Sequence, residues 1–78
     1  MKASKKAKRE YLYELRLKHR LTQAEIAAML GVSRQVYAYI EQGKRSGSAD
    51  FWAAIQRVFA VKDEDMYKLM KIKEQVEE

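Results

Sequence analysis

Two long polar side chains stand next to each other at Arg34 and Gln35. An arginine fork can donate to guanine O6 and N7 together, and a glutamine amide can bond in the same two-point manner to adenine N6 and N7. Tyr39 lies one helical turn after Gln35, where it can reach a phosphate or pack against a thymine methyl group. A solvated surface is the alternative for all three residues. Two adjacent residues of this kind favour contact with base edges for Arg34 and Gln35.

The residues before this pair predict the element that must position it. Ile26, Ala27 and Leu30 form the apolar stripe of a helix. Thr22, followed three residues later by Glu25, predicts a capping box at the start of that helix. Ala27 is small, so a second helix can approach closely. Residues 22–42 therefore have the pattern of a helix-turn-helix.

The turn and the second helix follow from the next residues. Gly31 is suited to the left-handed conformation just past a helix end. Ser33 is a good cap for a helix that begins at Arg34, and its hydroxyl could still meet a phosphate. Tyr37 and Ile40 face inward. Because a buried tyrosine hydroxyl needs a partner, the oxygen of Tyr37 is expected either to escape to the surface or to reach a phosphate.

Over roughly Leu12 to Met66 the chain resembles the Cro and phage-repressor type of helix-turn-helix protein, also called the XRE family. The matching pieces are Leu15-Arg16, Leu21-Thr22-Gln23, Ile26-Ala27, Leu30-Gly31-Val32-Ser33, Ile40-Glu41-Gln42-Gly43-Lys44, and Ile55 with Phe59 and Val61. The Leu-Thr-Gln entry and the Glu-Gln-Gly-Lys exit make the resemblance more specific than a helix-turn-helix alone.

The resemblance implies roles for several residues. Arg16 is expected to pair with Glu41 at the end of the second helix, through the two bonds that an arginine fork makes to a carboxylate. The loop after Gly43 is expected to lie on the DNA backbone, and Gly47 stands where the family usually has proline, so a looser loop is expected. The residues expected to contact the DNA backbone are Thr22, Gln23, Ser33, Lys44 and Arg45.

Composition bounds the class of protein. The 78 residues allow one domain, 1–78, and the absence of cysteine excludes a disulfide framework and cysteine-ligated zinc. The apolar runs are too short to span a membrane, and no apolar core follows the basic start as in a secretion signal. The net charge is +5: residues 1–20 hold eight basic and two acidic residues, whereas residues 62–78 hold four basic and six acidic residues. A basic front points to a polyanionic partner.

The rest of the chain completes the expected fold, an all-α, compact five-helix bundle with a helix-turn-helix, like a phage repressor DNA-binding domain. Residues 1–9 form a basic N-terminal arm, either a frayed helix start or a segment lying along phosphates. The first helix covers 10–20. Asp50 is expected to cap a helix that runs to about Ala60, with Trp52 in the core and a second apolar row at Phe51, Ala54 and Val58 that favours a homodimer contact.

A last helix is predicted over 63–78. Its apolar residues, Met66, Leu69, Met70, Ile72 and Val76, either fold back on the core or form a dimer seam, and the gain from burying them in so small a domain favours the seam. His19 has no visible companions for a catalytic or metal role.

The expected function is sequence-specific binding of double-stranded DNA, as a homodimeric repressor on a near-palindromic operator. Two other classes remain open: an antitoxin that binds both DNA and a toxin, and a protein-interaction module of the same fold. An enzyme is not expected, because no nucleophile–base set, carboxylate pair or phosphate loop is visible. No cofactor or metal is expected, the location is the cytoplasm, and the resemblance implies a bacterial or phage origin.

Overall fold

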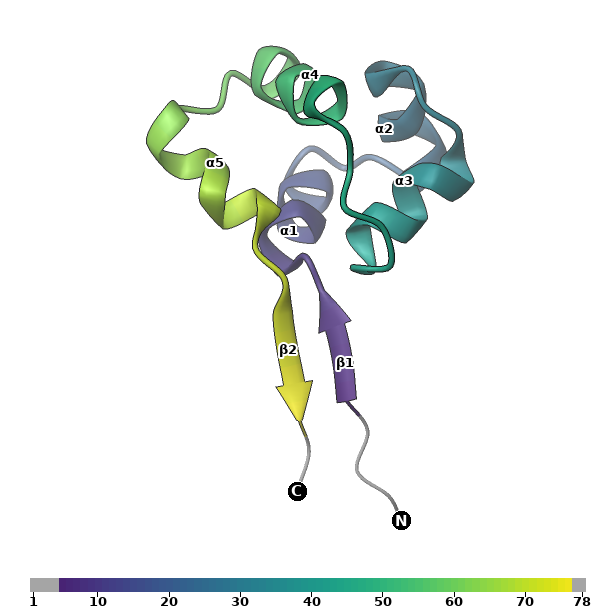
Figure 1. Cartoon of the computed structure of the whole chain (residues 1–78). Helices are drawn as coiled ribbons and strands as arrows, with labels where there is room; N and C mark the ends of the chain where they lie inside the picture. Colours follow the sequence, from purple (N-terminus) through teal and green to yellow (C-terminus); the bar gives the residue numbers. More distant parts are fainter. Residues whose placement is uncertain (1–4, 77–78) are drawn as a thin grey trace.

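Five short helices and a two-stranded ribbon make up the computed structural model, which describes residues 5–76, with side chains from residue 8 to residue 72. The elements in chain order are β1 (Lys5–Lys8), α1 (Glu10–Lys18), α2 (Gln23–Leu30), α3 (Arg34–Glu41), α4 (Ala49–Phe59), α5 (Asp63–Met70) and β2 (Lys73–Val76). The helices gather into one body, and the ribbon projects from it (Figure 1). The predicted arrangement of five helices is confirmed, and the ribbon is an addition that the sequence did not predict.

Local capping holds α2 and α3 as the sequence predicted. The Thr22 hydroxyl accepts from the backbone N–H of Glu25 at 3.1 Å, and the Glu25 carboxylate accepts from the N–H of Thr22 at 2.8 Å. Gly31 ends α2 with φ at 75°, in the left-handed region. The Ser33 hydroxyl then accepts from the N–H of Val36 at 3.1 Å and starts α3. The turn between the two helices is thus fixed by the backbone conformation of Gly31 at one end and by the Ser33 hydroxyl at the other.

The start of α4 differs from the prediction. Ser48, not Asp50, is the N-cap, since its hydroxyl accepts from the N–H of Phe51 at 3.1 Å. Asp50 lies in the first helical turn, where its negative charge faces the positive end of the helix dipole. Both residue types are good N-caps, so the type alone could not decide between two positions that are two residues apart.

The predicted helix over 63–78 is wrong beyond Met70. The chain becomes extended there, and Lys73–Val76 pairs antiparallel with Lys5–Lys8, with Lys5 opposite Val76 and Lys8 opposite Lys73. Residues 5–8 of the N-terminal arm therefore form a strand, while residues 1–4 lie outside the described residues. Apolar residues spaced by four suggested a helix, but the strand depends on a partner at the other end of the chain, which local periodicity does not reveal.

One core lies between the helices. Its fully buried large side chains are Leu12, Ile26, Tyr37 and Ile55, one from each of α1 to α4. Other buried apolar residues complete the same core: Ala27, Leu30, Ile40, Phe51, Trp52, Ala54 and Leu69. No helix within residues 5–76 is long and apolar enough to cross a membrane.

The second apolar row of α4 is mostly inside this core. Phe51 and Ala54 are buried and Val58 is partly buried against the core, so the row does not provide the exposed dimer face that was expected. On α5, Leu69 is buried and Met66 packs on the core, as a helix folding back would do. Met70 and Ile72 remain exposed, and the side chain of Val76 lies outside the described ones.

Candidate nucleic-acid interface

The end of α3 is anchored to α1 by an ion pair that the family resemblance implied. Arg16 Nε donates to Glu41 Oε1 at 2.8 Å, and Arg16 Nη2 donates to Glu41 Oε2 at 3.1 Å. The other terminal nitrogen of Arg16 donates to the carbonyl of Leu21 at 3.0 Å, so the same guanidinium also holds the segment between α1 and α2. Two parallel bonds fix the geometry as well as the charge.

Tyr37 completes this cluster from inside the core. Its ring is fully buried, and its hydroxyl donates to Glu41 Oε1 at 2.7 Å. The expectation that the oxygen would escape to the surface or reach a phosphate is therefore wrong. Tyr37 and Glu41 are four residues apart on one helix, a spacing at which side chains meet. The sequence contained this signal, because a carboxylate four positions after a buried tyrosine is a partner within reach.

The cluster sets the ionisation of its members. Burial alone would raise the pKa of Glu41, but hydrogen bonds from Arg16 and Tyr37 outweigh it and hold that pKa below its ordinary value. The hydrogen bond to Glu41 raises the pKa of Arg16. Burial, and then the bond to the Glu41 carboxylate, raises the pKa of Tyr37 far above its ordinary value. Glu41 is thus a fixed anion and Tyr37 a fixed donor.

The outer face of α3 carries the residues predicted to read bases. Arg34 and Gln35 are exposed, and Gln35 Nε2 donates to the Tyr39 hydroxyl at 3.1 Å. Lys44 Nζ lies 5.8 Å from the centre of the Tyr39 ring, within cation–π distance. The structure therefore brings Gln35, Tyr39 and Lys44 into one continuous polar surface. Ala38, which precedes Tyr39 on the same helix, is buried.

The start of α2 places its two candidate residues differently. The Thr22 hydroxyl is engaged in the capping box, and the Glu25 carboxylate sits beside it. Gln23 Nε2 donates to Glu41 Oε2 at 3.4 Å, a long bond that turns the amide toward the Arg16–Glu41 pair. Ser33 is exposed at the start of α3 while its hydroxyl caps the helix.

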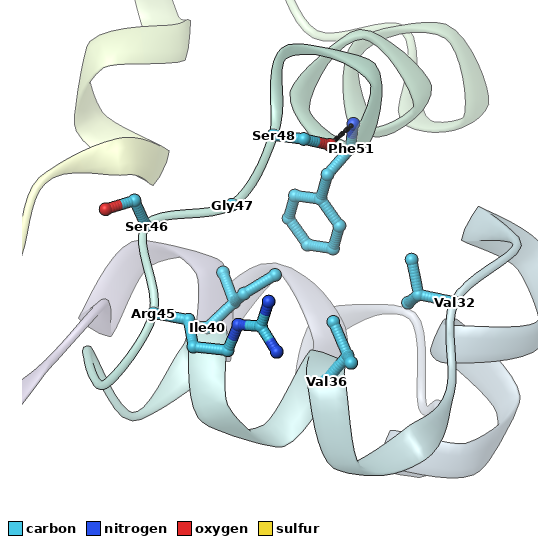
Figure 2. A pocket seen from close by; sticks show the side chains of 8 residues that line it. All are labelled: Val32, Val36, Ile40, Arg45, Ser46, Gly47, Ser48 and Phe51. Carbon is cyan, nitrogen blue, oxygen red and sulfur yellow. Dashed lines mark hydrogen bonds between the residues drawn. The ribbon is translucent and has the colours of Figure 1, made fainter.

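The loop between α3 and α4 carries the two basic residues Lys44 and Arg45, both exposed. The backbone N–H groups of both donate to the Tyr39 carbonyl, at 2.8 and 3.2 Å, which folds the loop back onto α3. An open pocket of about 350 Å³ lies under the loop. Figure 2 shows Phe51 pointing from α4 toward Val36 and Ile40 on α3, with the loop along the side.

The absence of the family's proline at Gly47 predicted a loose loop, but the loop is held by specific contacts. The Trp52 indole N–H donates to the Ser46 carbonyl at 3.1 Å. Gly47 has φ at 83°, and a Cβ built on it would lie 2.7 Å from Trp52 Nε1, so a glycine is needed for both its conformation and its lack of a side chain. The loop is thus packed tightly against α4.

Arg9 also holds the loop, and the sequence did not single it out. The residue is 5% exposed. Its terminal nitrogens donate to the carbonyls of Ile40 at 2.7 Å, Arg45 at 2.8 Å and Ser46 at 3.4 Å, and its Nε donates to the carbonyl of Met70 at 3.0 Å. In the sequence Arg9 is one basic residue in a run of them, and nothing local marks it as buried.

In this helix-turn-helix, the Arg16–Glu41 pair fixes the end of α3 to α1, and the outer face of α3 is polar and exposed. This is the arrangement of a DNA-binding protein. The comparison with protein families agrees, since the helix-turn-helix family HTH_3 matches residues 12–66. The chain belongs to this family.

Curated relatives give the same class. An uncharacterised HTH-type transcriptional regulator of Archaeoglobus fulgidus is 37% identical over 59 residues, which cover 76% of this chain and 83% of that protein. An uncharacterised HTH-type transcriptional regulator of Methanocaldococcus jannaschii is 45% identical over 49 residues, which cover 63% of this chain and 74% of that protein. No solved structure matches the chain significantly.

The chain is therefore similar throughout its motif to DNA-binding transcriptional regulators, and the family is not one of enzymes. Both relatives are archaeal, so the bacterial or phage origin implied by the resemblance gains no support from them.

Proposed function

We propose that the chain binds double-stranded DNA in a sequence-specific manner and regulates transcription as a homodimeric repressor on a near-palindromic operator. The observation that carries the proposal is the outer face of α3, where exposed Arg34 and Gln35 continue into Tyr39 and the basic loop. Repression would be steric, because an occupied operator excludes polymerase. A regulator of this kind works in the cytoplasm, where prokaryotic DNA lies.

The base-reading residues in this proposal are Arg34, Gln35 and Tyr39. In the docking known for repressors with this motif, the N-terminal part of the second helix enters the major groove. Arg34 would then face a guanine and Gln35 an adenine. The hydrogen bond between Gln35 and Tyr39 at 3.1 Å supports this pairing, because it holds the amide along the helix surface before DNA arrives. Tyr39 would pack on a thymine methyl group or reach a phosphate.

The residues that contact the DNA backbone in this proposal are Thr22, Gln23, Ser33, Lys44 and Arg45. Such contacts fix the orientation of the protein on the duplex and carry no sequence information. Lys44 and Arg45 are supported by their exposure and by the anchored loop. Gln23 can reach a phosphate by releasing its 3.4 Å bond to Glu41, and Thr22 and Ser33 lie exposed at helix starts, where N–H groups attract anions.

Homodimer formation would place two copies of α3 in successive major grooves, about 34 Å apart. Apolar side chains left exposed on α1 and α5 support an added interface, with Tyr11 50% exposed and Tyr67 62% exposed. The same residues support the alternative class, an antitoxin whose apolar surface binds a toxin or another partner protein. Copurification of a small protein encoded next to it would favour that alternative.

Selection of duplexes from a random DNA pool by the purified chain tests the proposal. An enriched inverted repeat is the expected result, and its half-site spacing gives the distance between the two copies of α3. A single enriched half-site would argue for a monomer or a missing partner. No enrichment, at a salt concentration that releases lysine-rich peptides from DNA, would contradict the proposal and favour a protein-interaction module of this fold.

A further inference from the structure

Arg9 is a buried cation whose hydrogen bonds connect three separate segments. It lies between β1 and α1, and its acceptors belong to the last turn of α3, to the loop after it and to the end of α5. Its backbone N–H also donates to the Glu41 carbonyl at 2.9 Å. The guanidinium carbon lies 5.5 Å from the centre of the Trp52 ring, and the Trp52 indole N–H donates to the Ser46 carbonyl.

The four groups that accept hydrogen bonds from the Arg9 side chain are all backbone carbonyls, and none of these four partners is a carboxylate. Burial lowers the pKa of Arg9 from its ordinary value, but the guanidinium remains charged at any working pH. A planar fork with five N–H donors can serve several carbonyls at fixed angles, which a lysine ammonium with three donors cannot. An arginine is therefore better suited than a lysine to bind these four carbonyls.

Two of the acceptors lie in the loop that carries the basic side chains. The Arg45 carbonyl points back to Arg9 at 2.8 Å, so the backbone at Arg45 is held from inside the molecule while its side chain stays exposed. The Ser46 carbonyl accepts from both Arg9 and Trp52. A loop whose backbone is held at two consecutive carbonyls has less backbone entropy left to lose when a partner binds.

We propose that Arg9 is a positioning residue for DNA binding, which holds residues 44–46 in the conformation that places Lys44 and Arg45 against the phosphate backbone. The inference rests on the proposed function, since it assumes that this loop meets DNA. Arg9 itself does not contact DNA in this account. Its effect is on how many phosphates the loop neutralises, and the bases read by α3 are unaffected.

The test compares Arg9→Met with Arg57→Met, which removes the same charge from the exposed surface of α4. Binding to a fixed 20-base-pair duplex is measured at several salt concentrations, at a temperature where each variant is folded. We expect Arg9→Met to bind roughly five- to fiftyfold more weakly at low salt, because the loosened loop no longer holds both basic side chains against phosphates. The slope of log K against log salt should fall by about 1 to 2, as for lost phosphate contacts.

Amide hydrogen exchange gives a readout that does not depend on DNA. We expect the amides of Lys44 and Arg45 to exchange faster in Arg9→Met, while those in the middle of α2 keep their protection. Arg57→Met should match the wild type at these amides and lose little of the salt slope. If Arg9→Met does not fold, Arg9→Lys replaces it, and loop exchange faster than wild type with a smaller salt slope is expected there too.

The inference and the proposed function can fail separately. If the folded Arg9 variant binds DNA with the wild-type salt slope and unchanged loop exchange, Arg9 serves stability only and the inference is overturned. If the loop amides exchange faster while binding is unchanged, Arg9 orders the loop but the loop does not meet DNA, which also overturns it. If the wild type does not bind duplex DNA at all, the proposed function itself is contradicted.

Discussion

Glu41 is almost fully buried and receives hydrogen bonds from three side chains, those of Arg16, Tyr37 and Gln23. Replacing it by glutamine leaves the Arg16 charge buried beside a neutral amide. We expect Glu41→Gln to lower the free energy of unfolding by ~3–5 kcal/mol, the range for breaking one side of a buried pair. Urea unfolding measures this. The double variant with Arg16→Met should cost less than the sum of the two single changes, and simple additivity would contradict the coupling.

The same pair makes stability depend on pH. Because the pKa of Glu41 is lower in the folded protein than its ordinary value of 4.5, the unfolded chain takes up the proton first as pH falls. The stabilisation from Glu41 is therefore complete above about pH 5.5 and is lost progressively below about pH 4.5. The difference in unfolding free energy between wild type and Glu41→Gln should shrink over that acidic range. A difference that stays constant down to about pH 3 would contradict the assignment.

Lys44 offers a test of the backbone role. Its ammonium lies over the Tyr39 ring and is exposed, so it can neutralise a phosphate without reading sequence. We expect Lys44→Ala to weaken binding to every duplex by a similar factor and to reduce the salt slope by about 1. Fluorescence anisotropy with a selected and an unrelated duplex measures both. Lys68→Ala, on α5, is the control, and a loss confined to one sequence would remove Lys44 from the backbone set.

At the residue scale, the sequence predicted the Arg16–Glu41 pair and missed Arg9. The pair, and the DNA contacts proposed for Arg34, Gln35 and Lys44, could be predicted because these residues match positions of a known motif. The role of Arg9 could not be predicted, because its acceptors are main-chain carbonyls 31 to 61 residues away. Every residue has such a carbonyl, so the residue types at those positions do not indicate the contact.

At the scale of elements, the loop between α3 and α4 is held by contacts from outside itself, those of Arg9 and Trp52. Gly31 and Gly47 both have positive φ, but only Gly47 has a neighbour where a Cβ would be. We expect Gly31→Ala to cost about 1–2 kcal/mol from its backbone conformation alone. Gly47→Ala should cost more, because the Cβ would also displace the buried Trp52 indole. Equal losses in urea unfolding would show that the indole gives way freely.

Element prediction succeeded where the signals are local and failed where they are not. Each cap of α2 and α3 joins residues three positions apart, Thr22 with Glu25 and Ser33 with Val36. Signals this local could be found in the sequence, so both helices were predicted. β2 pairs with a strand nearly 70 positions away. Its four residues alone do not specify an extended conformation, and a helix was the default continuation of α5.

For the whole molecule, the first and last elements that the structure describes, β1 and β2, pair with each other in the ribbon (Figure 1). A two-stranded ribbon is marginally stable alone in water. Arg9 follows β1 directly and binds the carbonyl of Met70, close before β2, so the base of the ribbon is joined to the helices and to the end of α3.

The measurement that bears most directly on the account is a parallel selection from one random duplex pool with the wild type and with Arg34→Ala, and with Arg57→Ala as the control. We expect the same half-site arrangement for all three proteins. Arg34→Ala alone should lose the preference for guanine at one position of each half-site, a loss of about 1–3 kcal/mol in discrimination. Identical base preferences for wild type and Arg34→Ala would contradict the claim that α3 reads the major groove through Arg34.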